Sequence, residues 1–181
     1  MLSVMPFTPY HFGPSGFIAL AFRKWIDVPV FVLANVVLDI EVLIIKTLGL
    51  GYPVHRYCHT LLIGAVVGVA WGLAAYPLRG VLKRLMDLIR IPYRTGLRKM
   101  LISGMLGVWL HVLIDGVYHY DVRLFWPSKS ISLWRMTQWR LGKEQIETLC
   151  LCFLLAAAVL YVLAVIAFLK ENRAQNQTPA K

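Results

Sequence analysis

Residues 100–120 read MLISGMLGVWLHVLIDGVYHY, and this stretch decides the fold. A helix needs about 20 predominantly apolar residues to cross the hydrocarbon layer of a membrane, which is about 30 Å thick. The stretch meets that requirement, yet it contains three ionisable side chains, those of His111, Asp115 and His119. A carboxylate inside the hydrocarbon layer is costly unless it is paired or bound to a metal ion. We therefore predict a membrane-spanning helix whose polar face has a function.

Other parts of the chain repeat this apolar pattern. Only 15% of all residues are charged, compared with about 25% in a typical soluble domain. Residues 13–22 are apolar but would span only about 15 Å as a helix, which suits a half-spanning or re-entrant helix. We expect an all-α, polytopic membrane protein with about four transmembrane helices plus this short N-terminal helix. The further spans are predicted at residues 28–50, 60–78 and 146–169, within a single membrane domain of residues 1–170 that precedes a polar tail at 171–181.

The formal net charge of +10 is concentrated between two of the spans, in residues 79–99. A short basic connection between spans is typical of the cytoplasmic side of a membrane, so the charge indicates topology and not nucleic-acid binding. With this connection in the cytoplasm, the third span runs outward and brings Asp115 and His119 towards the outer side. The same orientation places His59 at the outer end of the second span.

Further polar side chains are predicted at the same depth in the membrane as His111 and Asp115. At a rise of about 1.5 Å per residue, the candidates lie about 16 to 30 Å from the cytoplasmic ends of their segments. Helix tilt can absorb these differences. Five side chains that can bind a metal ion therefore meet in the outer half of the bilayer, and we predict them as ligands: His11, Asp39, His59, His111 and Asp115.

Helical spacing refines this set. His111 and Asp115 are four residues apart and share one helix face, which His119 extends by a turn. On its own, this stripe fits a metal site and a hydrogen-bonded cluster between helices equally well. Glu41 is about 200° away from Asp39 around a regular helix. We therefore predict Asp39 as a ligand and Glu41 as a supporting or proton-transfer group.

The N-terminal segment and residues 53–60 supply the other histidines. His55 and His59 are four residues apart and share a face if a helix already begins near Pro53. His11 lies among proline and glycine residues, which predicts a turn before the short apolar helix. Arg56 is suited either to bind an anionic headgroup or to anchor the chain at the membrane interface.

The residue types indicate which metal such a site would hold. Imidazole and carboxylate ligands suit zinc, with manganese or iron as alternatives. A catalytic zinc keeps an open position for water and lowers the pKa of that water to about 7. The set is large enough for one or two ions. In the second case Asp115 would bridge them, and an ion pair of this kind clamps the attacking and leaving oxygens of a phosphoryl group.

Five short elements in series resemble the YdjM-like family of bacterial inner-membrane proteins. The resemblance covers about residues 5 to 127 and departs from the family pattern at Glu41, Cys58 and Thr60. His119 and Asp121 stand where the family often has a proline-containing loop. The elements are His11 near Gly13, DIE at 39–41, HRYCHT at 55–60, His111-x-x-x-Asp115, and DVRLFWP at 121–127.

The resemblance implies a metal-dependent hydrolase of the inner membrane, distantly related to zinc-dependent phospholipase C and to single-strand nucleases. By that analogy one ion would be held by Asp39, His59, His111 and Asp115. A second ion would be held by His11 together with Asp115.

We therefore predict a multi-pass protein of the bacterial inner membrane that hydrolyses a phosphoester or ester bond of a lipid. Arg56 and Arg123 would bind the anionic headgroup, because guanidinium matches phosphate geometry. The alternative is a non-enzymatic protein that binds or transports a metal ion or protons. Haem binding is less favoured, because buried carboxylates are poor haem ligands. Catalytic roles are predicted for Asp115, Glu41 and His119, and supporting roles for His55, Asp121 and Asn35.

Overall fold

The computed structural model describes residues 9–51, 53–128, 132–137 and 143–177, and every regular element in these ranges is helical. Four helices are long and apolar enough to cross a membrane: Val28–Thr47, Leu61–Leu88, Leu97–Tyr118 and Glu144–Lys170. The prediction of an all-α, polytopic membrane protein is therefore confirmed. The elements are α1 (Pro9–Ala21), α2 (Val28–Thr47), α3 (Leu61–Ala75), the 3-10 turn η1 (Tyr76–Leu78), α4 (Arg79–Leu88), α5 (Leu97–Tyr118), α6 (Leu133–Thr137) and α7 (Lys143–Gln177).

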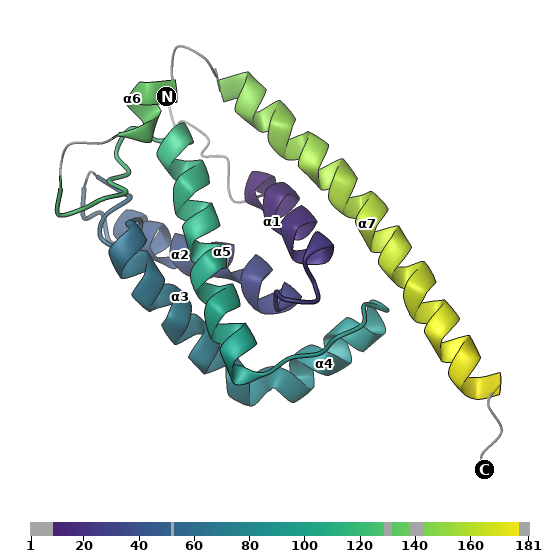
Figure 1. Cartoon of the computed structure of the whole chain (residues 1–181). Coiled ribbons are helices and arrows are strands. Elements are labelled where there is room, and N and C mark those ends of the chain that lie inside the picture. Colours follow the sequence, from purple (N-terminus) through teal and green to yellow (C-terminus); the bar gives the residue numbers. More distant parts are fainter. Residues whose placement is uncertain (1–8, 52, 129–131, 138–142, 178–181) are drawn as a thin grey trace.

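The helices α2, α3 and α5 form one group, and α1 lies between that group and α7 (Figure 1). At the end of the molecule opposite α6, α4 turns away from α3 and runs towards α7. The side chain of Met86 in α4 is buried in a cluster with Leu20 of α1 and Ala157 of α7. The short helix α1 is thus enclosed on two sides.

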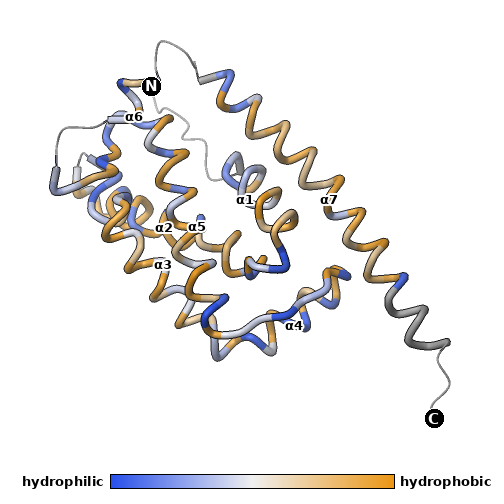
Figure 2. Tube along the Cα trace, viewed as in Figure 1, coloured by the Kyte–Doolittle hydropathy of each residue, from blue (hydrophilic) through white to orange (hydrophobic). Residues whose placement is uncertain are grey.

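Exposed and buried side chains follow the pattern of a protein in lipid. Large apolar side chains face outward, as Val66 (66% exposed) and Leu155 (70% exposed) do, and the outer helices are orange along much of their length in Figure 2. The interior instead holds polar side chains such as those of His59 and His111, which are fully buried. Lipid tails are as apolar as these outward side chains, so exposing them to lipid carries no penalty.

Glycines let α5 approach its neighbours closely. A Cβ atom added at Gly68 of α3 would lie 2.6 Å from the carbonyl oxygen of Gly104 in α5. A Cβ atom at Gly107 of α5 would lie 2.5 Å from the carbonyl oxygen of Phe31 in α2. Small residues allow this backbone contact between membrane helices. The consequence is that α2, α3 and α5 hold their polar side chains close together.

Side-chain caps explain where two spans begin. Asp27 is fully buried, and its carboxylate accepts a hydrogen bond from the backbone N–H of Val30 at the start of α2. The hydroxyl of Thr60 accepts from the N–H of Ile63 at the start of α3. Such caps satisfy N–H groups that have no partner inside the helix.

Two boundaries differ from the sequence prediction. Residues 79–99 were expected to form a loop, but α4 occupies Arg79–Leu88 and α5 begins at Leu97. The helix α4 forms because one side of it is apolar and buries Met86. On its charged side, Lys83 and Asp87 form an ion pair of 2.7 Å one turn apart. At the other end, α7 continues to Gln177, into the predicted polar tail, and residues 178–181 of that tail lie outside the described residues.

Candidate metal centre

The carboxylate of Asp115 in α5 lies at the centre of a cluster of imidazoles. Its Oδ1 atom is 3.0 Å from Nε2 of His11 in α1. Its Oδ2 atom is 3.0 Å from Nε2 of His111, one turn earlier in α5. The same oxygen is 3.6 Å from Nε2 of His59, just before α3. Asp115 is only 3% exposed, so this charge is buried among rings from three parts of the chain.

Two further imidazoles complete the cluster. Nε2 of His55 lies 3.8 Å from Oδ2 of Asp115, and Nε2 of His119 lies 3.9 Å from Oδ1. The chain has five histidines in all, and each of them therefore places Nε2 near this one carboxylate. Such convergence of residues so far apart in the sequence indicates a built site.

One group within the cluster has the geometry to hold a metal ion. Ligand atoms of Asp39, His59, His111 and Asp115 all lie within 4.8 Å of one another. Asp39 joins from α2, with Oδ1 placed 3.4 Å from Nε2 of His111. The sequence-derived set for the first ion is the same four residues.

A second group lies next to the first. Ligand atoms of His55, His119 and Asp121 are also within 4.8 Å of one another, and the rings of the two histidines lie 4.4 Å apart between centroids. Sequence reasoning gave the second ion to His11 and Asp115 and treated His55 and Asp121 as supporting residues. Sequence reasoning missed the second group because it did not consider that Asp121, three residues after the end of α5, can fold back onto the loop that carries His55.

Two carboxylates orient two of the imidazoles from behind. Oε2 of Glu41 lies 2.8 Å from Nδ1 of His59, and Oδ1 of Asp121 lies 2.9 Å from Nδ1 of His55. An ionised carboxylate can only accept, so Nδ1 carries a proton in each ring, and Nε2 has the lone pair in the neutral form of the ring. Both Nε2 atoms face Asp115. This carboxylate–histidine arrangement is the one that proteins use to orient metal ligands.

The same carboxylates hold the loop of residues 53–60. Glu41 accepts from the N–H of Cys58, and Asp121 accepts from the N–H groups of Val54 and His55. No helix begins at Pro53, since α3 begins only at Leu61, so the condition under which His55 and His59 would share a helix face is not met. His55 and His59 meet because Glu41 and Asp121 fix the loop, and their ring centroids lie 4.8 Å apart.

His11 also differs from its predicted setting, because it lies within α1 and not in a turn before it. The hydroxyl of Ser15 donates to the carbonyl oxygen of His11 one turn away. The ring of His11 stacks on the ring of His111, with centroids 4.3 Å apart and planes 17° apart. The helix α1 thereby brings the imidazole of His11 onto His111, in the C-terminal half of α5.

The hydrogen bonding of the buried imidazole nitrogens shows whether these residues are suited to a metal ion. Among the described residues, Nε2 of His11, His59 and His111 is buried and makes no aligned hydrogen bond, although each approaches a carboxylate oxygen of Asp115. Buried polar atoms without partners are rare in folded proteins. A cation held with Asp39 and Asp115 would satisfy Nε2 of His59 and His111, whereas His11 lies outside both candidate groups. Imidazole with carboxylate fits zinc, manganese or iron. The donor set therefore fits a divalent metal ion.

The protonation states of the cluster residues outside the spans also suit metal binding. Burial lowers the pKa of His119 to about 4 and lowers that of His59 as well, which keeps both rings neutral at pH 7. Burial opposes ionisation of Asp121, but its hydrogen bond with His55 lowers its pKa to about 2. Neutral imidazoles and ionised carboxylates are the forms that bind metal.

Three other predicted residues have different positions. Asn35 donates from Nδ2 to the carbonyl oxygen of Val32 in its own helix, and within the described residues its side chain makes no hydrogen bond to the cluster. Arg56 and Arg123 line a pocket of about 290 Å³ together with His55. The two arginines thus lie beside His55, which in turn lies near Asp115.

Comparison with known proteins gives one family. The sequence model of a family described as YdjM inner membrane protein matches residues 15–173. Neither the curated proteins nor the solved structures contain a significant match to this chain. The matched range takes in almost the whole helical structure and every member of the cluster except His11. The chain therefore belongs to the YdjM family of inner membrane proteins.

Proposed function

We propose that this protein is a metal-dependent hydrolase embedded in the bacterial inner membrane, where it cleaves a phosphoester or ester bond of a lipid. The observation that supports this most strongly is the meeting of every histidine of the chain around the buried carboxylate of Asp115. Intramembrane ionisable residues are rare and mark functional sites. Nε2 of His59 and of His111 is buried without an aligned hydrogen bond, and a metal ion at this position would give both nitrogens a partner.

The first ion would be held by Asp39, His59, His111 and Asp115. Zinc suits these ligands, and manganese or iron are the alternatives. When bound, such an ion supplies a hydroxide nucleophile at neutral pH and polarises the bond to be cleaved. A second ion would be held by His55, His119 and Asp121, and Asp115 lies next to both groups.

The protein residues around the ion would then divide the remaining work. Both carboxylate oxygens of Glu41 are engaged, one by Cys58 and one by His59, so we assign Glu41 to orienting His59. His119 is the least enclosed ring among the residues that contact Asp115, with its side chain 23% exposed. In the form with one ion, we assign proton transfer to Nε2 of His119.

A hydrolysis assay tests this proposal. The protein would be reconstituted into vesicles that contain phosphatidylglycerol, and released products would be measured with and without zinc or manganese. We expect turnover that needs the metal and that is lost in His111→Ala and Asp115→Asn. The exposed Asp87→Asn on α4 serves as the matched control and should keep full activity. Metal-dependent uptake into the vesicles without any product would favour the transport alternative and contradict the hydrolase.

A further inference from the structure

Two hollows in the protein surface meet at the same pair of side chains. The first is the pocket of about 290 Å³, lined by Pro53, His55, Arg56, Tyr57, Arg123 and Trp126. The second is a groove of about 480 Å³ between α2 and α3, and it also includes Arg56 and Tyr57. A molecule that occupies both would pass directly over these two residues.

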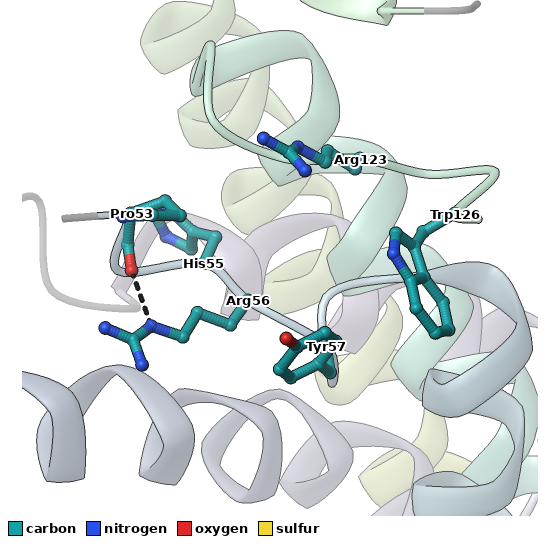
Figure 3. Close-up of a pocket in the computed structure, with 6 residues that line it drawn as sticks. All are labelled: Pro53, His55, Arg56, Tyr57, Arg123 and Trp126. Atoms are coloured by element: carbon teal, nitrogen blue, oxygen red, sulfur yellow. Dashed lines mark hydrogen bonds between the residues drawn. The ribbon is translucent and has the colours of Figure 1, made fainter. Parts of the chain in front are cut away.

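The pocket has the chemistry of an anion site (Figure 3). Two guanidinium groups line it, and none of its described lining residues is a carboxylate. Nε of Arg56 donates to the carbonyl oxygen of Pro53 and Nη2 donates to that of Leu50, so its position is fixed. Arg123 projects from the other side of the pocket in Figure 3, and its side chain is exposed. Arginine recognises phosphate through just such planar donor groups.

The pocket also has the features of a membrane interface. The rings of Tyr57 and Trp126 meet edge to face with their centroids 5.5 Å apart. Tyrosine and tryptophan concentrate at the level of lipid headgroups, where one side of the ring is apolar and the other is wet. A phosphate held here would be at the depth of a headgroup phosphate.

The groove differs from the pocket because most of the residues that line it are apolar. It extends from Arg56 and Tyr57 along Ile44, Ile40 and Val37 of α2 and faces Val67 of α3. These residues belong to two of the candidate membrane spans, and the side chains of Ile40 and Ile44 are each 48% exposed. From Ile44 to Val37 the groove covers about two helical turns, or roughly 10 Å. A hydrocarbon chain in the bilayer is the occupant that matches this surface.

Each hollow ends on a residue that touches the metal centre. His55 lines the pocket, and its Nε2 lies 3.8 Å from Oδ2 of Asp115. Glu41 lines the groove, and its carboxylate holds Nδ1 of His59. The junction between phosphate and acyl chain would therefore lie next to the cluster.

We propose that the site takes a phospholipid that enters sideways from the bilayer, with its phosphate between Arg56 and Arg123 and one acyl chain between α2 and α3. This rests on the proposed hydrolase function and adds the substrate class and its route. A water-soluble phosphoester would fill the pocket alone and would not need the groove.

Binding can be measured apart from turnover by photolabelling. The probe is a phosphatidylglycerol that carries a diazirine in one acyl chain, and the full-length protein is studied in nanodiscs without added metal. We expect labelled peptides from α2 and α3 around Ile40 and Val67. Ile40→Trp, which fills the groove, should reduce that labelling several-fold, and Arg56→Gln with Arg123→Gln should reduce it as well. Val159→Trp on the exposed face of α7 is the matched control (Val159 is 61% exposed) and should leave it unchanged.

Labelling that spreads evenly over all lipid-facing helices and ignores Ile40→Trp would overturn the proposal. Chain length separates this failure from failure of the hydrolase itself. If wild type cleaves dihexanoyl and dioleoyl phosphatidylglycerol and Ile40→Trp slows only the dioleoyl lipid, the route is supported. If Ile40→Trp cleaves both lipids at the same rates as wild type, the route is rejected and the hydrolase function stands. If wild type cleaves neither lipid, the hydrolase function is rejected, and the labelling experiment still tests the binding site.

Discussion

Oε2 of Glu41 lies 2.8 Å from Nδ1 of His59, and this hydrogen bond joins the middle of α2 to the loop before α3. It leaves Nε2 of His59 directed at Asp115. A residue that does not itself contact the ion position therefore determines how one of the ligands points. Asp121 does the same for His55 from the other side of the site.

Replacing Glu41 by glutamine should weaken metal binding without unfolding the protein. The amide oxygen still accepts from His59 Nδ1, but the negative charge that strengthens the ligand is lost. Removal of such an orienting partner typically costs about 10- to 100-fold in metal affinity. Competition with a chelator measures the change. Glu144→Gln at the exposed start of α7 should bind as wild type does, and unchanged affinity in Glu41→Gln would show that this carboxylate plays no part in metal binding.

Replacing Asp121 by alanine should loosen residues 53–60. Three donors lose their acceptor at once, namely the N–H groups of Val54 and His55 and Nδ1 of His55. An unsatisfied buried donor costs about 1–3 kcal/mol. Hydrogen exchange should show faster exchange in this loop but not in α5. Protection equal to wild type throughout the loop would mean that Asp121 does not hold it.

Alanine at Gly68 should destabilise the protein, whereas alanine at Gly80 should not. The new methyl group at Gly68 would meet backbone atoms of α5, at 2.6 Å from the carbonyl oxygen of Gly104. Overpacking of this kind costs about 1–3 kcal/mol. Nothing lies within 4 Å of a Cβ at Gly80 in α4, and alanine there gains up to about 1 kcal/mol of helix propensity. Thermal unfolding in detergent compares the two, and equal melting temperatures would contradict the close contact.

Removal of metal should lower the melting temperature of the wild type. An ion that binds only the folded state stabilises it by about 2.7 kcal/mol when its free concentration is 100 times Kd. A chelator should therefore lower the melting temperature, and added zinc should restore it. Asp115→Asn should respond to neither, while a wild type that is equally insensitive would speak against a metal that supports the fold.

The spans and the core of the site could be predicted because they depend on local spacing. The shared face of His111 and Asp115 follows from helical geometry, and the depth of Asp39 follows from counting residues along α2. Spacing and depth gave five candidate ligands, and the family resemblance narrowed the first ion to the four residues that the structure groups as one candidate site.

The rest depends on contacts between distant segments, which spacing does not encode. The loop at 53–60 takes its shape from Glu41 and Asp121, and no local pattern connects these residues with it. His11 lies in a helix because α1 is enclosed between α7 and the other spans, although its proline and glycine residues favour a turn. The helix α4 was missed because its many charges conceal the apolar side that buries Met86.

Metal analysis of the detergent-purified protein tests the central claim most directly. Elemental mass spectrometry would compare wild type, Asp115→Asn and the exposed control Asp87→Asn, each purified without chelator. We predict one or two equivalents of zinc, manganese or iron in the wild type and in Asp87→Asn, and loss of this metal in Asp115→Asn. Wild type free of these metals, or Asp115→Asn with the same content as wild type, would contradict a metal centre built around Asp115.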